Sequence, residues 1–376
     1  METKEKNRIT FRELWALCPG RHVVLLVSLA WLVFYFALRS HRGLMNFLCR
    51  VLVRPWHKAA GSVFSLVPFS LAEWCILLMV LAGLAFFVQL LIHAIGRRGK
   101  AALARWAVTL AGTAACLFGL FCLWWGVFYY SDSFAEQSGI EVRGVTVSEL
   151  KEVTAYFADA ANEYAPLVQR DEYGVYTADE KSLFDRSRTL YHPAEETFPC
   201  LRGPELRAKP AVFSRFMSRI NYTGYFFPYT AEANLNVDSP ICFLPSTIAH
   251  ELAHQRGVAG EDEANFVGIF ACMESGDPDF IYSGALLAYT YLGNALHSAS
   301  YADWEEIAAT LSDEVWNDLI FNNAYWQQFF ETTASEVSEK VYEGFLRTYG
   351  DDRGMQSYGA CVDLLVAWYG RERMIP

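Results

Sequence analysis

The sequence predicts a membrane bundle of three helical spans, followed by a mainly helical α+β domain with a small sheet. Of the 376 residues, 53% are hydrophobic, too many for an ordinary soluble protein. Residues 1–130 hold 14 Lys/Arg and 4 Asp/Glu, a balance of +10, whereas residues 131–376 hold 17 Lys/Arg and 38 Asp/Glu, a balance of −21. Such asymmetry indicates two parts in different surroundings. The acidic second part also argues against a nucleic-acid partner, which would need a basic face.

Three uncharged runs predict spans at about residues 23–39, 74–95 and 106–130. The second and third exceed the ~18 apolar residues that indicate a crossing helix, and the first is close to the lower limit. A buried helix of a globular core is the alternative for each. The third run ends in Trp and Tyr residues, which favour the membrane interface. Residues 44–58 mix apolar and basic side chains, typical of a helix lying in the interface or of a loop.

The Lys/Arg distribution predicts that the C-terminal domain lies outside the cytoplasm. Three spans put the N-terminal segment and the second connection on one side of the membrane, and both are basic, as cytoplasmic segments usually are. Their basic residues are Lys4, Lys6, Arg8, Arg12, Arg21, Arg97, Arg98, Lys100 and Arg105. The first connection argues in the opposite direction, because it carries Arg39, Arg42, Arg50, Arg54 and Lys58.

In the domain at residues 131–376, residues 146–169 begin with a capping-box pattern and continue with apolar residues at helical spacing. Residues 171–210 contain four prolines and predict loops with a short helix. Residues 222–228 and 230–237 are the strand candidates. From Pro245 onward the pattern is helical, with breaks at Gly276–Asp279, Ser298–Asp303 and Gly350–Gly354.

Two further features of the sequence bear on the number of spans and on the role of the cysteines. Residues 280–302 are uncharged but contain polar side chains, which favours a buried helix over a fourth span. The nine cysteines form no CxxC pair, so a cysteine zinc site is not expected, although one or two disulfides in the domain are possible from the sequence.

One motif carries chemistry. Residues 250–254 read His-Glu-Leu-Ala-His. On a helix, His250 and His254 share a face one turn apart and can bind one zinc ion. Glu251 can then act as general base on a metal-bound water. Two histidines and a glutamate on a solvated helix face are the alternative.

A zinc site needs a third protein ligand. A third histidine would fall at position 260 in one familiar layout, but this residue is Gly260. The following residues, Glu261 to Asn265, begin a second helical pattern. A glutamate on a second helix is the gluzincin arrangement, and we expect Glu261 as the ligand, with Asn265 on the same face steadying a ligand. Glu263, which points the other way, is the alternative.

Other candidate residues are weaker. The strand at 230–237 could be an edge strand that pairs with a substrate backbone, with Asn234 and Asn236 on one side. Tyr358 and His297 are candidates for a donor that stabilises the transition state, although a structural role is the simpler interpretation for both.

Most of the chain resembles an uncharacterised family of bacterial membrane proteins, a domain-of-unknown-function family with zinc-metallopeptidase-like motifs. The resemblance rests on the three spans and on four segments of the sequence. These are Val67–Ser70, Phe227–Asn234, His250–Phe266 and Ser357–Gly359. It implies a membrane-anchored, zincin-like domain and supplies no substrate.

The sequence therefore predicts a membrane-anchored zinc metallopeptidase that acts on a peptide or protein substrate outside the membrane, with the lipid bilayer as its other partner. The alternative is a membrane sensor that uses a zincin-like domain to bind a ligand without turnover, because three spans exceed what an anchor needs. A structural or assembly protein without metal is a third hypothesis. The sequence leaves the oligomeric state open.

Overall fold

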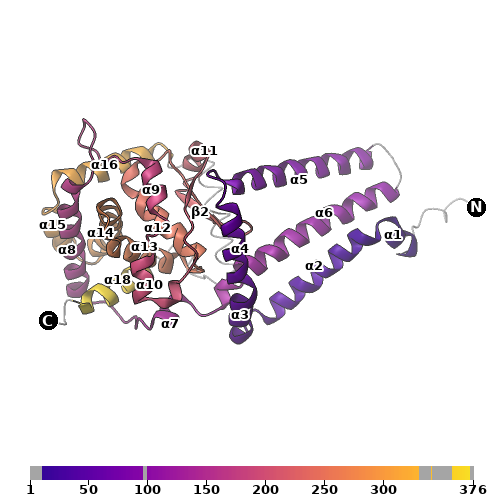
Figure 1. Cartoon of the computed structure of the whole chain (residues 1–376), viewed down its shortest axis with the longest axis horizontal. Helices are drawn as coiled ribbons and strands as arrows, with labels where there is room; N and C mark the ends of the chain where they lie inside the picture. Colours follow the sequence, from indigo (N-terminus) through magenta and orange to yellow (C-terminus); the bar gives the residue numbers. More distant parts are fainter. Residues whose placement is uncertain (1–10, 96–99, 330–339, 341–357, 373–376) are drawn as a thin grey trace, which may run out of the picture.

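The computed structural model describes residues 11–95, 100–329, 340 and 358–372. The chain is mostly helical and has one small three-stranded sheet. Long helices extend from one side of a rounded domain, and the N-terminal helix α1 (Phe11–Leu17) lies at their far end (Figure 1). The predicted combination of three apolar helices and a mainly helical domain with a small sheet is confirmed at this level.

Three helices are long and apolar enough to cross a membrane. They are α2 (Pro19–Leu38), α5 (Leu71–Ile95) and α6 (Lys100–Phe121), the last continuing as a π-helical turn over Cys122–Gly126. A helix in a globular core would bury most of its side chains, but α5 buries only Ala72 and Glu73 at its start. The three helices therefore expose the apolar surface that a lipid environment would cover.

The third span ends earlier than predicted. Its helical turn stops at Gly126, and Phe128–Tyr130 form a 3-10 helix. Trp125 and Phe128 are buried against the domain, and the Trp125 and Phe226 ring centroids are 5.3 Å apart. The aromatic residues that the sequence assigns to an interface belt thus pack against protein, because the domain covers this end of the span.

Residues 42–64 form a helix rather than a loop. Helix α3 (Arg42–Leu48), a π-helical segment (Cys49–Val53) and α4 (Arg54–Phe64) follow one another without a break. They lie across the domain-side ends of the spans (Figure 1). Arg42 forms an ion pair with Glu136 of the domain, so part of the basic first connection is neutralised by the domain itself.

The two longest helices of the domain pack against each other. Helix α8 (Val147–Tyr164) begins with the predicted capping box between Thr146 and Glu149. Helix α14 (Pro278–Ala299) buries 12 of its 22 residues, so it is a core helix and not a fourth span. This pair forms one side of the main hydrophobic core.

The remaining domain elements are shorter, and the predicted loop region 171–210 contains two short helices. The α-helices are α7 (Phe134–Ser138), α9 (Glu180–Arg186), α10 (His192–Thr197), α11 (Ser214–Arg219), α12 (Leu244–Gln255), α13 (Glu261–Glu274), α15 (Tyr301–Ala308), α16 (Asp313–Gln327) and α18 (Tyr358–Glu372). Short 3-10 helices cover Ala165–Leu167, Pro199–Leu201 and Ile241–Phe243. The predicted break at Gly350–Gly354 lies outside the described residues. All nine cysteines lie inside them, and all are free thiols.

The sheet has the order β1–β3–β2, with β1 (Lys209–Pro210), β2 (Gly224–Phe227) and β3 (Glu232–Leu235). The prediction that residues 230–237 form an edge strand is wrong, because β3 pairs with β2 on one side and with β1 on the other. Asn234 and Asn236 are buried and donate to main-chain carbonyls of Glu232 and Tyr222 at 3.0 and 2.9 Å. Both asparagines therefore stabilise the domain rather than contact a substrate.

Buried carboxylates join the start of α5 to the sheet. Glu232 of β3 accepts hydrogen bonds from the backbone N–H groups of Leu71 and Ala72, at 3.2 and 2.8 Å, and forms an ion pair with Lys209. In return, Glu73 of α5 accepts from the N–H groups of Val212 and Phe213, at 2.7 and 2.8 Å. Charge-assisted hydrogen bonds of this kind are strong in a buried setting, so the domain is fixed on the ends of the spans.

Candidate metal centre

Helix α12 presents the two histidines of the motif on one face. Pro245 lies in the first turn, where a missing N–H costs nothing. The helix stops at Gly257, whose φ of +90° suits glycine, and a Cβ there would lie 2.5 Å from the Phe128 ring. The rings of His250 and His254 have centroids 4.7 Å apart and are nearly perpendicular, at 87°.

Helix α13 brings the third residue to this pair. Glu261, Asn265 and Gly268 follow one another at i, i+4 and i+7, so they share one face of the helix. At Gly268 this face packs so tightly on α12 that a Cβ would lie 2.9 Å from the backbone N of His250. Two turns earlier, Glu261 Oε2 lies 3.3 Å from His250 Nε2 and 3.6 Å from His254 Nε2.

The three side chains could hold a metal ion. One donor atom from each of His250, His254 and Glu261 lies within 4.8 Å of the others. Donors on one tetrahedral zinc ion, at about 2.0–2.1 Å from it, lie about 3.3–3.5 Å apart. The two His–Glu separations agree with this spacing. Two imidazoles and a carboxylate also suit other divalent metals, so the donors do not select zinc.

The surroundings of His254 fix which nitrogen faces Glu261. His254 Nδ1 lies 2.7 Å from the carbonyl oxygen of Val258, which favours a proton on Nδ1 and leaves Nε2 for a metal. The Trp125 ring packs edge-to-face on His254, with centroids 5.4 Å apart. Within the described part of the chain, no hydrogen bond joins Asn265 to any of the three residues, so its expected supporting role has no contact behind it.

Charge coupling within the group is strong. Burial alone would lower the pKa of His254, but the Glu261 carboxylate outweighs burial and raises this pKa to about 9. Burial would raise the pKa of Glu261, and the two histidines instead hold it well below its usual value. Glu261 therefore stays ionised at neutral pH and stabilises a positive charge beside it. A metal ion would supply that charge and would displace the extra proton from the histidines.

Glu263 does not belong to the group. Its two carboxylate oxygens accept hydrogen bonds from the N–H groups of Phe134 and Ala135, each at 2.9 Å, at the start of α7. A carboxylate there satisfies main-chain donors that a helix leaves free. The geometry thus separates the two glutamates that the sequence leaves as alternatives, and places Glu261 with the histidines.

Glu251 is buried beside the candidate ligands. Glu251 is 4% exposed, and its Oε2 atom has no hydrogen-bond partner among the described residues. Burial raises the pKa of Glu251 to about 7, and the neighbouring histidines act in the opposite direction. The carboxylate packs on β2, where a Cβ on Gly224 would lie 2.6 Å from Oε1. A carboxyl group with a pKa near neutrality, beside a possible metal site, has the properties of a general base.

The other two candidates are not brought to the group by any observed contact. His297 is exposed near the end of α14, where its ring packs against Tyr301 and Trp304. The side chain of Tyr358 lies outside the described residues. The sequence reasoning missed Trp125, Gly224 and Gly268, and a signal existed only for Gly268, whose spacing from Glu261 puts it on the same helix face.

The group is open to solvent on one side. The side chains of His250 and Glu261 are 14% and 23% exposed, whereas that of His254 is 6% exposed. A cavity of about 370 Å³ borders Glu261 and is also lined by Phe128, Gly257 and Glu263. A ligand could therefore approach from the Glu261 side, close to the domain-side end of α6.

Comparison with known families identifies the chain. It belongs to the family described as "Protein of unknown function (DUF3810)", whose family model matches residues 49–366. No curated protein and no solved structure matches the chain.

Proposed function

We propose that this member of the family is a membrane-anchored zinc peptidase that hydrolyses peptide bonds outside the cytoplasm. In this proposal His250, His254 and Glu261 hold the metal, and Glu251 is the general base. The observation that carries the proposal is the meeting of three donor atoms within 4.8 Å beside a buried glutamate. A structural metal site would not need that glutamate.

The residues have a division of labour in this proposal. A bound zinc ion would polarise the scissile carbonyl and lower the pKa of water towards neutrality. Glu251 would take a proton from the attacking water on its carboxylate and pass it to the leaving amine. Val258 would hold the tautomer of His254 through its carbonyl.

The sheet offers a place for an extended substrate. Strand β2 pairs with β3 alone among the described strands, so its other edge has no strand partner. Gly224 of this strand touches Glu251. A substrate peptide could add to the free edge of β2 as a further strand, which is β-augmentation. Such a peptide would pass close to the general base. This assigns to β2 the role that the sequence suggests for residues 230–237.

The site lies near the membrane. Trp125, at the domain-side end of α6, touches His254, so a substrate would be bound close to the end of the spans. Helix α1, the C-terminal end of α5 and the N-terminal end of α6 lie at the end of the bundle away from the domain (Figure 1). The positive-inside pattern assigns that end to the cytoplasm and the domain to the outer side.

The direct test uses the full-length protein in detergent and a library of fluorescence-quenched peptides. We expect hydrolysis by the wild type and a fall of at least about 100-fold in Glu251→Gln, because a positioned general base contributes at least that factor. Glu251→Gln should retain its metal. Glu172→Gln, an exposed carboxylate elsewhere in the domain, is the matched control and should cleave normally. Hydrolysis that persists unchanged in Glu251→Gln would exclude Glu251 as the general base and contradict the proposal.

A sensor that binds a ligand without turnover is the second candidate. Two hydrogen bonds to buried carboxylates favour it, from the Ala72 N–H to Glu232 and from the Val212 N–H to Glu73. They connect the start of α5 to the domain and would transmit a change in the domain to this span. It predicts one metal ion per chain and no cleavage of any peptide in the library. Metal-dependent cleavage by the wild type would exclude a pure sensor.

A further inference from the structure

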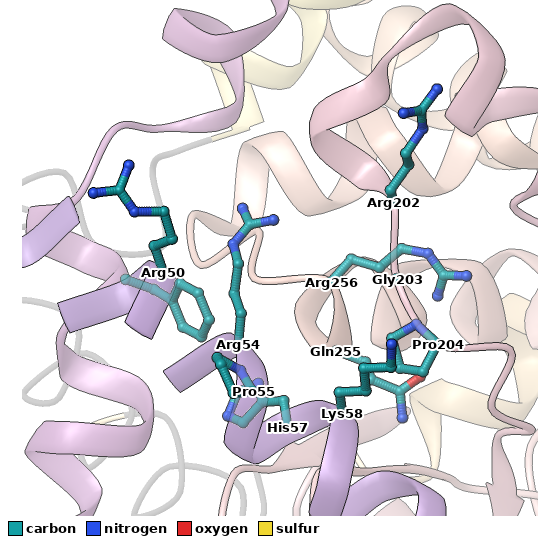
Figure 2. Close-up of a pocket in the computed structure, with 11 residues that line it drawn as sticks. Arg50, Arg54, Pro55, His57, Lys58, Arg202, Gly203, Pro204, Gln255 and Arg256 are labelled. Atoms are coloured by element: carbon teal, nitrogen blue, oxygen red, sulfur yellow. The ribbon is translucent and has the colours of Figure 1, made fainter. Parts of the chain in front are cut away.

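A second cavity lies between the α3–α4 segment and the domain, and its lining is strongly basic. It has a volume of about 430 Å³. Five of its lining residues are cationic and none is acidic (Figure 2). These five are Arg50, Arg54, Lys58, Arg202 and Arg256. We call this cavity the basic pocket; it is lined by neither histidine of the candidate metal group.

Most of this charge has no counter-ion among the residues that the structure describes. Across the described residues, Arg50, Lys58 and Arg202 form no ion pair, and all three are exposed. Arg54 donates to the carbonyl oxygen of Cys200 at 3.3 Å. Only Arg256 reaches a carboxylate, at 3.4 Å from Glu195. Several unpaired cations around one cavity repel each other, and a bound anion would relieve that repulsion.

The buried part of the lining carries polar atoms that lack partners. His57, Gln255 and Arg256 are 2%, 3% and 5% exposed. Their atoms His57 Nδ1, Gln255 Oε1 and Arg256 Nε have no hydrogen-bond partner among the described residues. Leaving such a buried atom unsatisfied is unfavourable, so a ligand that reached these three atoms would stabilise the lining of the cavity.

The chemistry of these atoms narrows the ligand. His57 Nε2 and Gln255 Nε2 lie 2.9 and 2.7 Å from carbonyl oxygens, so His57 Nδ1 and Gln255 Oε1 are left as acceptors. Arg256 Nε and the other cations are donors. A ligand that suits this set has anionic oxygens together with a hydroxyl or ammonium donor. Guanidinium groups bind phosphate oxygens in particular, through paired hydrogen bonds.

The position of the pocket indicates where such a ligand comes from. Arg50, Arg54 and Lys58 belong to the segment that lies across the domain-side ends of the spans (Figure 1). This is the level at which the headgroups of a bilayer around α2, α5 and α6 would lie. A phosphate of an anionic headgroup at this level would lie within reach of the guanidinium groups, which bind phosphate oxygens on either side of a membrane.

We propose that the basic pocket binds a phosphate group, carried by the headgroup of an anionic phospholipid. The arginines take the phosphate oxygens, and His57 and Gln255 accept from the hydroxyl or ammonium groups of the headgroup. The site is independent of the metal group and of its proposed chemistry, and it would fix the domain against the bilayer surface.

The test measures binding of a short-chain phosphatidylglycerol to the full-length protein in an uncharged detergent, by native mass spectrometry. We expect saturable binding of one lipid per chain and at least a tenfold loss of affinity in Arg50→Gln combined with Arg202→Gln. Neither arginine side chain makes a hydrogen bond or ion pair within the described part of the chain, so the folded state should tolerate both changes. Arg188→Gln, an exposed arginine away from the pocket, is the matched control.

A second arm separates the two sources of phosphate. Inorganic phosphate at millimolar concentration should not displace the lipid if the headgroup is the ligand. Displacement of the lipid from the wild type by millimolar phosphate would assign the pocket to free phosphate and overturn the headgroup as its ligand. Lipid affinity that is unchanged in this variant, or that falls equally in Arg188→Gln, would overturn the proposal. Metal content should be the same in all of these variants.

Discussion

Glu261 and Glu263 are two residues apart, yet their carboxylates serve different parts of the molecule. A helix turns by about 100° per residue, so side chains at i and i+2 point in nearly opposite directions. Glu261 faces the two histidines, and Glu263 holds the start of α7. The sequence reduces the third donor to these two, but the choice depends on where α7 begins, and that contact joins residues 129 positions apart.

Replacement of Glu263 tests this separation. We expect Glu263→Gln to lower the stability by about 1–2 kcal/mol, because the start of α7 loses a charged acceptor. Its metal content should stay at the wild-type level. Thermal unfolding and metal analysis on the same sample measure both effects. Loss of metal in a folded Glu263→Gln protein would show that Glu263 and not Glu261 completes the site.

At the scale of elements, the sequence predicts the helices and strands that depend on neighbouring residues, but not the pairings between distant segments. The capping box at Thr146 and the strands around 224–227 and 232–235 follow from nearby residues. The central position of β3 does not, because its second neighbour β1 is a two-residue strand that contains Pro210. The packing of Trp125 on His254 likewise joins two helices whose contact no local pattern encodes.

The close approach of α12 and α13 gives a prediction at this scale. In Gly268→Ala the added methyl group would lie 2.9 Å from the backbone N of His250, so the helices must move apart. We expect a loss of about 1–3 kcal/mol in stability, as for other overpacked sites, together with weaker metal binding. A competing chelator titrated against the metal-loaded protein measures the affinity.

Gly359→Ala is the matched control for this change, since a Cβ at Gly359 in helix α18 meets none of the described residues within 4 Å. It should be neutral or slightly stabilising. Wild-type metal affinity and stability in Gly268→Ala would contradict the view that this contact positions Glu261.

At the scale of the whole molecule, the spans and the domain are joined through buried charge. The segments Val67–Ser70 and Phe227–Asn234, which carry part of the family resemblance, lie near each other in the structure. Lys209 donates to the carbonyl oxygen of Phe69 at 3.1 Å and pairs with Glu232. The sequence predicts the spans and the domain separately, but this joint depends on contacts between residues about 160 positions apart.

Breaking this joint should be costly. Glu232→Gln would leave Lys209, whose side chain is 3% exposed, as an unpaired buried charge. We expect a loss of about 3–5 kcal/mol, and partial recovery when Lys209→Met is added, because the buried charge is then removed. Thermal unfolding of the full chain in detergent measures both.

Glu306→Gln breaks an ion pair with Lys151 at the surface and serves as the comparison. Its effect on thermal unfolding should be much smaller than that of Glu232→Gln, because solvent screens an exposed ion pair. An equally small effect of Glu232→Gln would mean that the spans and the domain are only loosely connected.

We propose that this chain holds a catalytic metal ion through His250, His254 and Glu261, whose donor atoms lie within 4.8 Å of one another. The most direct measurement is the metal content of the full-length protein, purified in detergent, for the wild type and for His250→Ala, Glu261→Ala and Glu251→Gln. We predict about one zinc ion per chain in the wild type and in Glu251→Gln, and loss of the metal in the other two variants. A well-folded wild type that takes up no divalent metal would show that these three residues do not form a metal site.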